Sequence, residues 1–159
     1  MKVLHTESSL GWGGQELRTV LETEALMRRG HQVQIACCPE SQFGFRSGLG
    51  SDILVFVALH KKRPRCVLAA YRLLKQLAPD IVVTHSSTDA WVLTIARCFL
   101  VKPPIMIRMR HVRASVQVNL MTRWMYQQAV MTVTTSEDIR RHLIERLCLP
   151  DSRVVSVPT

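Results

Sequence analysis

The residues best suited to binding and catalysis lie in three short segments, and each segment directly follows an apolar run. The first segment combines three glycines with a tryptophan and runs into a predicted helix. Glycine allows the backbone to approach a ligand closely, and the N-terminus of a helix attracts phosphate or carboxylate. A plain turn between a strand and a helix would use the same glycines, so this segment alone leaves both interpretations open. Its candidate substrate-binding residues are Gly11, Trp12, Gly13, Gly14, Gln15 and Glu16.

Two histidines mark the second and third segments. His85 is followed by Ser86, and His111 is preceded by Arg110. An imidazole can donate a hydrogen bond to a sugar hydroxyl or a phosphate, and it can move a proton near neutral pH. A single histidine is usually structural, but two at neighbouring strand ends favour a functional site. The remaining histidines are expected to be structural: His5, His31, His60 and His142.

Trp12 differs from the other two tryptophans, which fall in predicted helices and are expected in the core. It stands between glycines in a loop. Its large ring is therefore expected to pack over the crevice or to stack on a ligand.

Short β-branched runs alternate with helical periodicity along the whole chain. This alternation predicts an α/β fold, a Rossmann-like doubly wound parallel sheet of about six or seven strands with helices on both faces. In a 3-2-1-4-5 strand order, the three polar segments would meet at the carboxyl edge of the sheet, where such folds bind ligands. Strands are expected at 1–5, 32–37, 52–58, 81–84, 105–109, 129–134 and 153–157, and helices at 15–29, 65–77, about 86–100, around 116–124 and after Ser136.

The helix expected at 15–29 has an apolar stripe that would pack on this sheet. Leu17, Val20, Leu21 and Ala25 share one face at helical spacing, although Glu24 falls inside the same face. These leucine and valine side chains are therefore expected on the buried face of this helix.

Composition restricts the class of protein. The 159 residues fit one domain, and an apolar content of 47% is enough for a core. An acidic residue as early as Glu7 argues against a secretory signal, so a cytoplasmic protein is expected. The histidines and cysteines show no zinc-binding spacing, so no structural metal is expected.

The net charge of +9 indicates an anionic partner. Aromatic residues make up only 6% and show no base-stacking pattern, so nucleic acid is not expected as a partner. An anionic membrane surface or a phosphate-bearing ligand fits better, although a solvated basic loop remains the alternative to a membrane face. The bases that would form such a face are Lys61, Lys62, Arg63, Arg65, Arg72 and Lys75.

The glycine segment is not a dinucleotide fingerprint. A Gly-x-Gly-x-x-Gly motif would need glycine at Glu16, and no acid follows the second strand to hold a ribose. A nicotinamide-dependent enzyme is therefore disfavoured.

A series of motifs, taken in order, resembles family 4 glycosyltransferases. Gly11-Trp12-Gly13-Gly14-Gln15-Glu16 is similar to the opening of that family, in a variant typical of bacterial cell-envelope polysaccharide transferases. The later motifs that resemble the family are Arg18, 29–33, 79–85, Arg110-His111, 135–137 and 155–159.

The resemblance implies a retaining enzyme of the two-domain GT-B fold whose N-terminal domain binds mainly the acceptor. It places the glycine loop near the donor diphosphate and His111 near the transferred sugar, which makes His111 the candidate catalytic residue. The nucleotide-sugar, a co-substrate held mainly by the C-terminal domain through a Glu-x7-Glu motif, would be the donor, and the reaction would need no metal or other cofactor.

Residues 1–159 would then be a single acceptor-side domain without the donor-binding domain. The chain would be either a one-domain piece or a truncated gene product, and it is expected to be inactive alone. Its exposed edge would favour self-association, and its acceptor would be a glycan or glycolipid. The alternative is a standalone Rossmann-like module that binds a phosphorylated or anionic ligand.

Overall fold

The computed structural model describes residues 1–114 and 116–158. Within them, seven strands form one sheet in the order β3-β2-β1-β4-β5-β6-β7, and every neighbouring pair is parallel. The strands are β1 (Lys2–Glu7), β2 (Gln32–Cys37), β3 (Leu54–Phe56), β4 (Ile81–Thr84), β5 (Ile105–Arg110), β6 (Met131–Thr134) and β7 (Val154–Ser156). The helices are α1 (Gly14–Arg28), α2 (Phe43–Arg46), α3 (Pro64–Leu77), α4 (Ser87–Arg97), α5 (Leu120–Gln127) and α6 (Glu137–Leu147), with a short 3₁₀ turn η1 (Asp151–Arg153).

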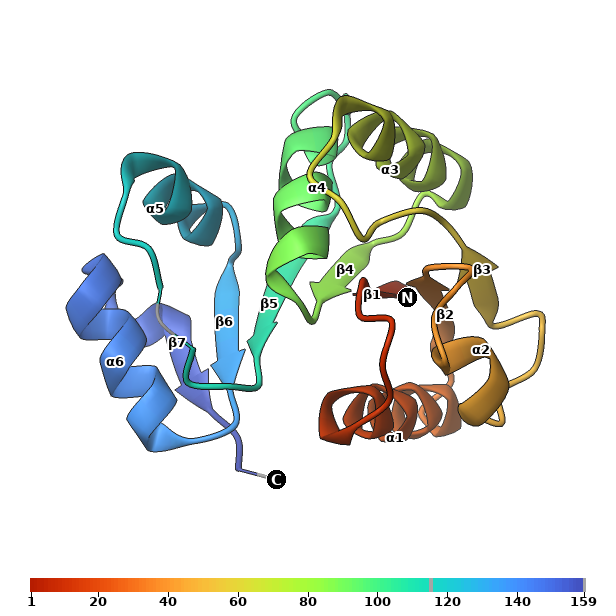
Figure 1. The fold of residues 1–159 in the computed structure, drawn as a ribbon, viewed down its shortest axis with the longest axis horizontal. Coiled ribbons are helices and arrows are strands. Elements are labelled where there is room, and N and C mark those ends of the chain that lie inside the picture. Colours follow the sequence, from red (N-terminus) through yellow and green to blue (C-terminus); the bar gives the residue numbers. More distant parts are fainter. Residues whose placement is uncertain (115, 159) are drawn as a thin grey trace.

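Helices lie on both faces of the sheet (Figure 1). On one face, α1 and α2 pack against Val3, Val33 and Ile35. On the other face, α3 and α4 pack against Leu4 and Val82, and the core continues to α5 and α6 over β7. The predicted doubly wound parallel sheet is therefore confirmed.

The strand order reverses between β1 and β4, as the 3-2-1-4-5 order requires. Loops leaving these two strands run in opposite directions across the sheet, which opens a crevice at the carboxyl ends. The three polar segments of the sequence all lie at this edge, because they follow β1, β4 and β5.

The prediction for the apolar face of α1 is partly wrong, because only Val20 of its four residues is buried. Leu17 and Leu21 are 51% and 55% exposed, whereas Glu16, Thr19 and Thr23 are buried together with Val20. The reason is that the sheet presents polar side chains to α1. The periodicity of leucines gave the wrong face because it assumed an entirely apolar sheet surface.

The predicted helix around 116–124 is partly wrong. Helix α5 begins at Leu120, and the side chain of Asn119 caps it by accepting a hydrogen bond from the Thr122 amide. Val116 therefore lies outside the helix, and Leu120 is 85% exposed instead of buried. No helix among the described residues is long and apolar enough to span a membrane.

On the sheet face that carries α1, strands β5, β6 and β7 have exposed apolar side chains. Ile105, Met131 and Val155 are 49%, 36% and 37% exposed. Exposed apolar surface beside an edge strand favours self-association. The expected self-association stays a prediction: light scattering should show a mean mass that grows with concentration, and a constant monomer mass would contradict it.

The packing of α6 generates a stability prediction. Leu143 is fully buried against Leu147 and Val154. Leu143→Ala should lower the free energy of unfolding by about 2–5 kcal/mol, because it removes buried methyl groups and leaves a cavity. Leu120→Ala, at an exposed position, is the matched control and should change it by less than about 0.5 kcal/mol. Urea denaturation of both variants measures this; equal losses would contradict the packing.

Candidate functional site

Two adjoining cavities of about 130 and 350 Å³ lie between the carboxyl ends of β4 and β5 and the first turn of α1. We refer to them together as the carboxyl-edge crevice. The smaller cavity is lined by Gln15, His85, Ser86, Ser87, Arg108, Met109, Arg110, His111 and Val112. The larger one is lined by Gly14, Gln15, Arg18, His111, Val112 and Thr135. His111, Gln15 and Val112 therefore face both.

Six of the predicted site residues line this crevice, and four do not. Those that line it are Gly14, Gln15, His85, Ser86, Arg110 and His111. The remaining four are Gly11, Trp12, Gly13 and Glu16. Ser87 and Arg108 also line the crevice and were not among the predicted site residues, and Arg18 was named only for its resemblance to the family.

Trp12 lies against the neighbouring part of the core. Its ring meets Phe43 of α2 edge-on, with centroids 5.7 Å apart and planes inclined by 70°. This packing accounts for a tryptophan in the loop without a ligand. Glu16 is buried in the first turn of α1, and the contribution of these residues to binding stays a prediction.

A buried carboxylate, Asp89, joins two of the segments that form the crevice. It accepts hydrogen bonds from the Thr6 hydroxyl of β1 at 2.8 Å and from the backbone amides of His85 and Ser86 at 3.2 and 3.0 Å. The Ser86 hydroxyl donates to it as well, at 3.0 Å. Burial raises the pKa of Asp89 to about 6, while these hydrogen bonds favour its ionised form.

Glu7, at the end of β1, is a second buried carboxyl group. It accepts hydrogen bonds from the Ser9 amide at 2.8 Å and from the side-chain amide of Gln15. Burial, followed by the nearby charge of Asp89, raises its pKa to about 8. Glu7 is therefore largely protonated at neutral pH, and it holds the glycine loop against the start of α1.

Three imidazoles form a connected row that ends in the crevice. The Nδ1 atom of His5 lies 2.8 Å from Nε2 of His85, and Nδ1 of His85 lies 3.1 Å from Nε2 of His111. Burial lowers the pKa of His5 and of His111 to about 4, and it holds that of His85 well below its ordinary value. At His111, Arg18 also lowers the pKa and Glu16 raises it. All three rings are therefore neutral at pH 7.

His5 was expected to be structural, and the structure brings it into contact with His85. The two residues are 80 positions apart in sequence. Their contact follows from the pairing of β1 with β4, which places His5 opposite Val83, two residues before His85.

Arg108 is the least satisfied polar side chain at the crevice. It is only 4% exposed, and its Nε and Nη1 atoms have no hydrogen-bond partner among the described residues. Its guanidinium lies over the Tyr126 ring, 4.0 Å from the centroid. Neighbouring Arg110 donates to the Ala114 carbonyl at 2.7 Å. The unpartnered Nε–H and Nη1–H groups can donate hydrogen bonds to an anionic or hydroxyl oxygen of a ligand in the smaller cavity.

One group of potential metal ligands comes together, consisting of His5, Glu22 and His85. In this conformation the imidazoles bond to each other, and Glu22 pairs with Arg18 at 2.7 Å. These contacts engage Nδ1 of His5, Nε2 of His85 and Oε1 of Glu22, whereas Nε2 of His5 has no partner among the described residues. The expectation that the protein uses no metal stays a prediction.

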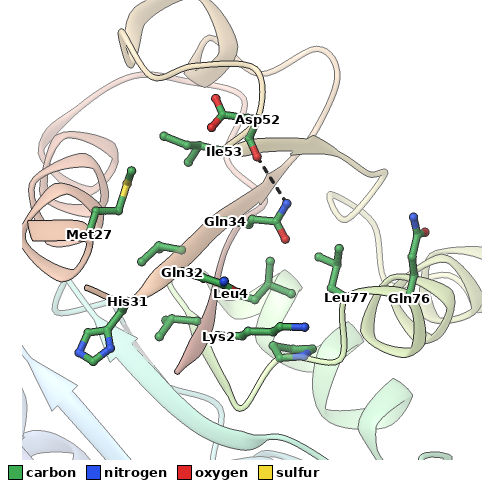
Figure 2. A pocket seen from close by; sticks show the side chains of 13 residues that line it. Lys2, Leu4, Met27, His31, Gln32, Gln34, Asp52, Ile53, Gln76 and Leu77 are labelled. Atoms are coloured by element: carbon green, nitrogen blue, oxygen red, sulfur yellow. Dashed lines mark hydrogen bonds between the residues drawn. The ribbon is translucent and has the colours of Figure 1, made fainter. Parts of the chain in front are cut away.

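A larger cavity, of about 570 Å³, lies at the opposite, amino edge of the sheet (Figure 2). Lys2, Gln34 and Asp52 contribute to its lining, and the Gln34 side chain donates to the Asp52 carbonyl at 3.5 Å. The polar side chains of its lining are those of Lys2, His31, Gln32, Gln34, Asp52 and Gln76. Because parallel sheets bind ligands at their carboxyl ends, we assign the site to the crevice despite its smaller volume.

The comparison with known families decides the relationship. Residues 12–159 match the sequence profile described as Glycosyltransferase Family 4. The chain belongs to glycosyltransferase family 4. No curated protein matches it in sequence.

Solved structures agree with this assignment at the level of fold. The family 4 chain superposes on a glycosyltransferase from Rickettsia africae with a TM-score of 0.74 and 18% identity, covering 99% of this chain and 42% of that one. The superposition on Anabaena Alr3699/HepE in complex with UDP-glucose has a TM-score of 0.73 at 14% identity, and it covers 99% of this chain and 43% of that one. The superposition on MurG of Acinetobacter baumannii has a TM-score of 0.68 at 13% identity, and it covers 99% of this chain and 46% of that one. The family 4 chain thus spans less than half of each relative.

The buried Glu7 predicts that the stability of the fold depends on pH. A pKa raised from 4.5 to about 8 means that the fold favours the protonated acid, so the free energy of unfolding should fall as pH rises through this range. The slope due to one group is at most about 1.4 kcal/mol per pH unit. Glu7→Gln mimics the neutral acid, and its stability relative to the wild type should therefore increase steadily from pH 5 to pH 8.

Urea denaturation at several pH values measures this difference. Glu145→Gln is the control, because it makes the same substitution at an exposed position on α6. A constant difference for Glu7→Gln would show that Glu7 is ionised in the folded protein.

Proposed function

We propose that this chain is the acceptor-side half of a retaining glycosyltransferase, which transfers a sugar from a nucleotide-sugar to a glycan or glycolipid of the bacterial cell envelope. The observation that carries the proposal is the position of His111 in a family 4 domain: it lies where the two cavities of the crevice adjoin. A group in that position can contact an acceptor in one cavity and a donor sugar in the other.

The 350 Å³ cavity of the crevice has a lining that supports the binding of a diphosphate there. It is lined by Gly14 and Gln15 at the N-terminus of α1, and no side chain caps this helix end. Free backbone amides and the helix dipole favour an anion there, and Arg18 adds positive charge. These groups would stabilise charge on the leaving diphosphate, the step at which preorganised donors contribute most to the rate.

The smaller cavity supports an acceptor with several oxygens. Ser86, Ser87, Arg108 and Arg110 converge on it. Hydroxyl and guanidinium groups recognise sugar hydroxyls or phosphate by directional hydrogen bonds. Among the relatives, HepE was solved with UDP-glucose, which fits a nucleotide-sugar as donor.

The second candidate function is a standalone module that binds a phosphorylated ligand. The Nε and Nη1 atoms of Arg108, which have no hydrogen-bond partner among the described residues, favour anion binding as such, and this observation does not require catalysis. The two candidates differ in one respect: only the first needs a second domain and a transferred sugar.

Substitution of His111 tests the leading proposal. In the full-length enzyme, His111→Ala should lower kcat by roughly two to four orders of magnitude, the effect typical of a positioned proton-transfer or charge-stabilising group. His31→Ala, in the amino-edge cavity, is the control and should leave kcat unchanged. The assay follows transfer from a panel of nucleotide-sugars to a lipid-linked glycan. A near-native rate for His111→Ala would show that His111 is structural.

The 159-residue chain alone should show no detectable transfer, and at best weak donor binding. The reason is that a GT-B catalytic centre takes groups from both domains. Robust transfer by this chain would contradict the assignment as an acceptor-side half.

We further propose that the protein works in the cytoplasm with one surface of α3 against an anionic membrane. Arg65, Leu68, Arg72 and Lys75 are exposed at intervals of three and four residues, so they share one face of α3. Lys61, Lys62 and Arg63 precede this face and are exposed as well.

The turn between α4 and β5 lies beside α3 and adds apolar side chains. Phe99 and Val101 are 69% and 99% exposed. They line a shallow cavity together with Lys75 and Lys102. Bases surrounding exposed apolar side chains are the combination that binds the surface of an anionic bilayer.

Liposome sedimentation tests the membrane surface. Binding should require anionic lipid, and it should fall by about tenfold or more in a variant with Arg65, Arg72 and Lys75 changed to Gln. A control variant with Arg29, Arg141 and Arg146 changed to Gln removes the same charge from exposed positions elsewhere and should bind nearly as the wild type does. Equal binding to neutral vesicles, or equal loss in both variants, would contradict the proposal.

A further inference from the structure

The three imidazoles follow a diagonal line across the sheet. His5 lies within β1, His85 directly after β4, and His111 directly after β5. The register pairs His5 with Val83 and Thr84 with Arg108. Each histidine is therefore about two residues closer to the carboxyl edge than the one before, on the sheet face that carries α1. The row leads from the buried interior to the crevice.

The rings meet edge to edge through their nitrogens. The centroids of His5 and His85 are 5.1 Å apart, and those of His85 and His111 are 5.3 Å apart. The facing nitrogens are much closer, at 2.8 and 3.1 Å. These are hydrogen-bond distances, so each contact holds one proton between two nitrogens.

Thr19 of α1 determines which nitrogen of His85 carries the proton. The Thr19 hydroxyl donates its only hydrogen to the Gln15 carbonyl at 3.0 Å. Its oxygen also lies 3.3 Å from Nδ1 of His85, and it can only accept there. The proton of neutral His85 is therefore on Nδ1, from which it is shared between Thr19 and Nε2 of His111.

The direction of the two remaining bonds follows. Without a proton, Nε2 of His85 accepts from Nδ1–H of His5. At the inner end, Nε2 of His5 is left as a bare acceptor, and it has no partner among the described residues. At the outer end, Nε2 of His111 accepts from His85, which leaves the ring proton of neutral His111 on Nδ1.

We propose that Thr19, His85 and His5 are positioning residues that hold His111 in its Nδ1–H form, so that His111 presents a hydrogen-bond donor to an oxygen of the ligand in the crevice. This inference rests on the proposed function for the identity of that oxygen, a sugar hydroxyl or a phosphate oxygen. Because both ring nitrogens are then occupied, His111 orients the substrate and stabilises negative charge. It does not remove a proton from the acceptor hydroxyl.

Long-range ¹H–¹⁵N spectra of the ¹⁵N-labelled chain test the tautomer directly. At pH 7, His111 should show a protonated Nδ1 and an unprotonated Nε2, as His5 and His85 should. His31, which makes no such contact, is the internal reference and should show the Nε2–H form that free histidine prefers. A protonated Nε2 on His111 would overturn the inference. This experiment needs no substitution.

Two variants of Thr19 test its role. Thr19→Val keeps the shape of the side chain and removes the acceptor, so it should lower the ratio of Nδ1–H to Nε2–H at His111 by roughly fivefold, the worth of one neutral hydrogen bond. Thr19→Ser keeps the hydroxyl and should preserve the ratio. An unchanged ratio in folded Thr19→Val would show that Thr19 does not position the row.

Activity of the full-length enzyme separates this inference from the proposed function. His111→Asn supplies an amide donor near the position of Nδ1 and should retain about tenfold more kcat than His111→Ala, whereas His111→Asp should not. Equal rates for Asn and Ala would contradict the donor role. Absence of transfer by the wild type would instead refute the proposed function, and the tautomer measured by NMR would be unaffected.

Discussion

The crevice depends on one buried carboxylate. Asp89 accepts hydrogen bonds from Thr6 of β1, from His85 directly after β4 and from Ser86, the N-cap residue of α4. Thr6 and Ser86 therefore stay at fixed positions on either side of the strand reversal. A parallel sheet opens at such a reversal, and the opening keeps a defined shape only if polar groups at its edge are satisfied. Without Asp89, several buried donors would lose their acceptor at once.

A second constraint is the polar surface between the sheet and α1. The row of imidazoles lies on the sheet face that α1 covers, and the Thr19 hydroxyl of α1 lies 3.3 Å from Nδ1 of His85. Burial keeps the imidazoles neutral. Neutral partners can form directional hydrogen bonds in a low-dielectric interior without the cost of burying charge. The leucines of α1 face outward as a consequence. The core is thus less apolar beneath the crevice than elsewhere, and its hydrogen bonds hold His111 in place.

The fold could be predicted from the sequence, because strand–helix alternation and the rule for right-handed crossovers leave few topologies. The candidate site was placed by the same reasoning, since His85, Arg110 and His111 lie at the carboxyl ends of β4 and β5, and its role in binding stays a prediction. The contact of His5 with His85 could not be predicted, because it depends on the register between strands. The neutral state of Glu7 depends on burial, which periodicity does not report. Trp12 was expected over the crevice, but Phe43 of a short helix that the sequence did not delimit provides its packing partner.

If the carboxyl-edge crevice is the ligand site, a phosphate probe should bind there and not in the larger cavity at the amino edge. Titration of the ¹⁵N-labelled chain with inorganic pyrophosphate, followed by amide chemical shifts, distinguishes the two. The account predicts saturable shifts centred on Gly14, Gln15 and His111. Shifts centred instead on Lys2, His31 and Gln34 of the amino-edge cavity, or no saturable shifts at all, would contradict it.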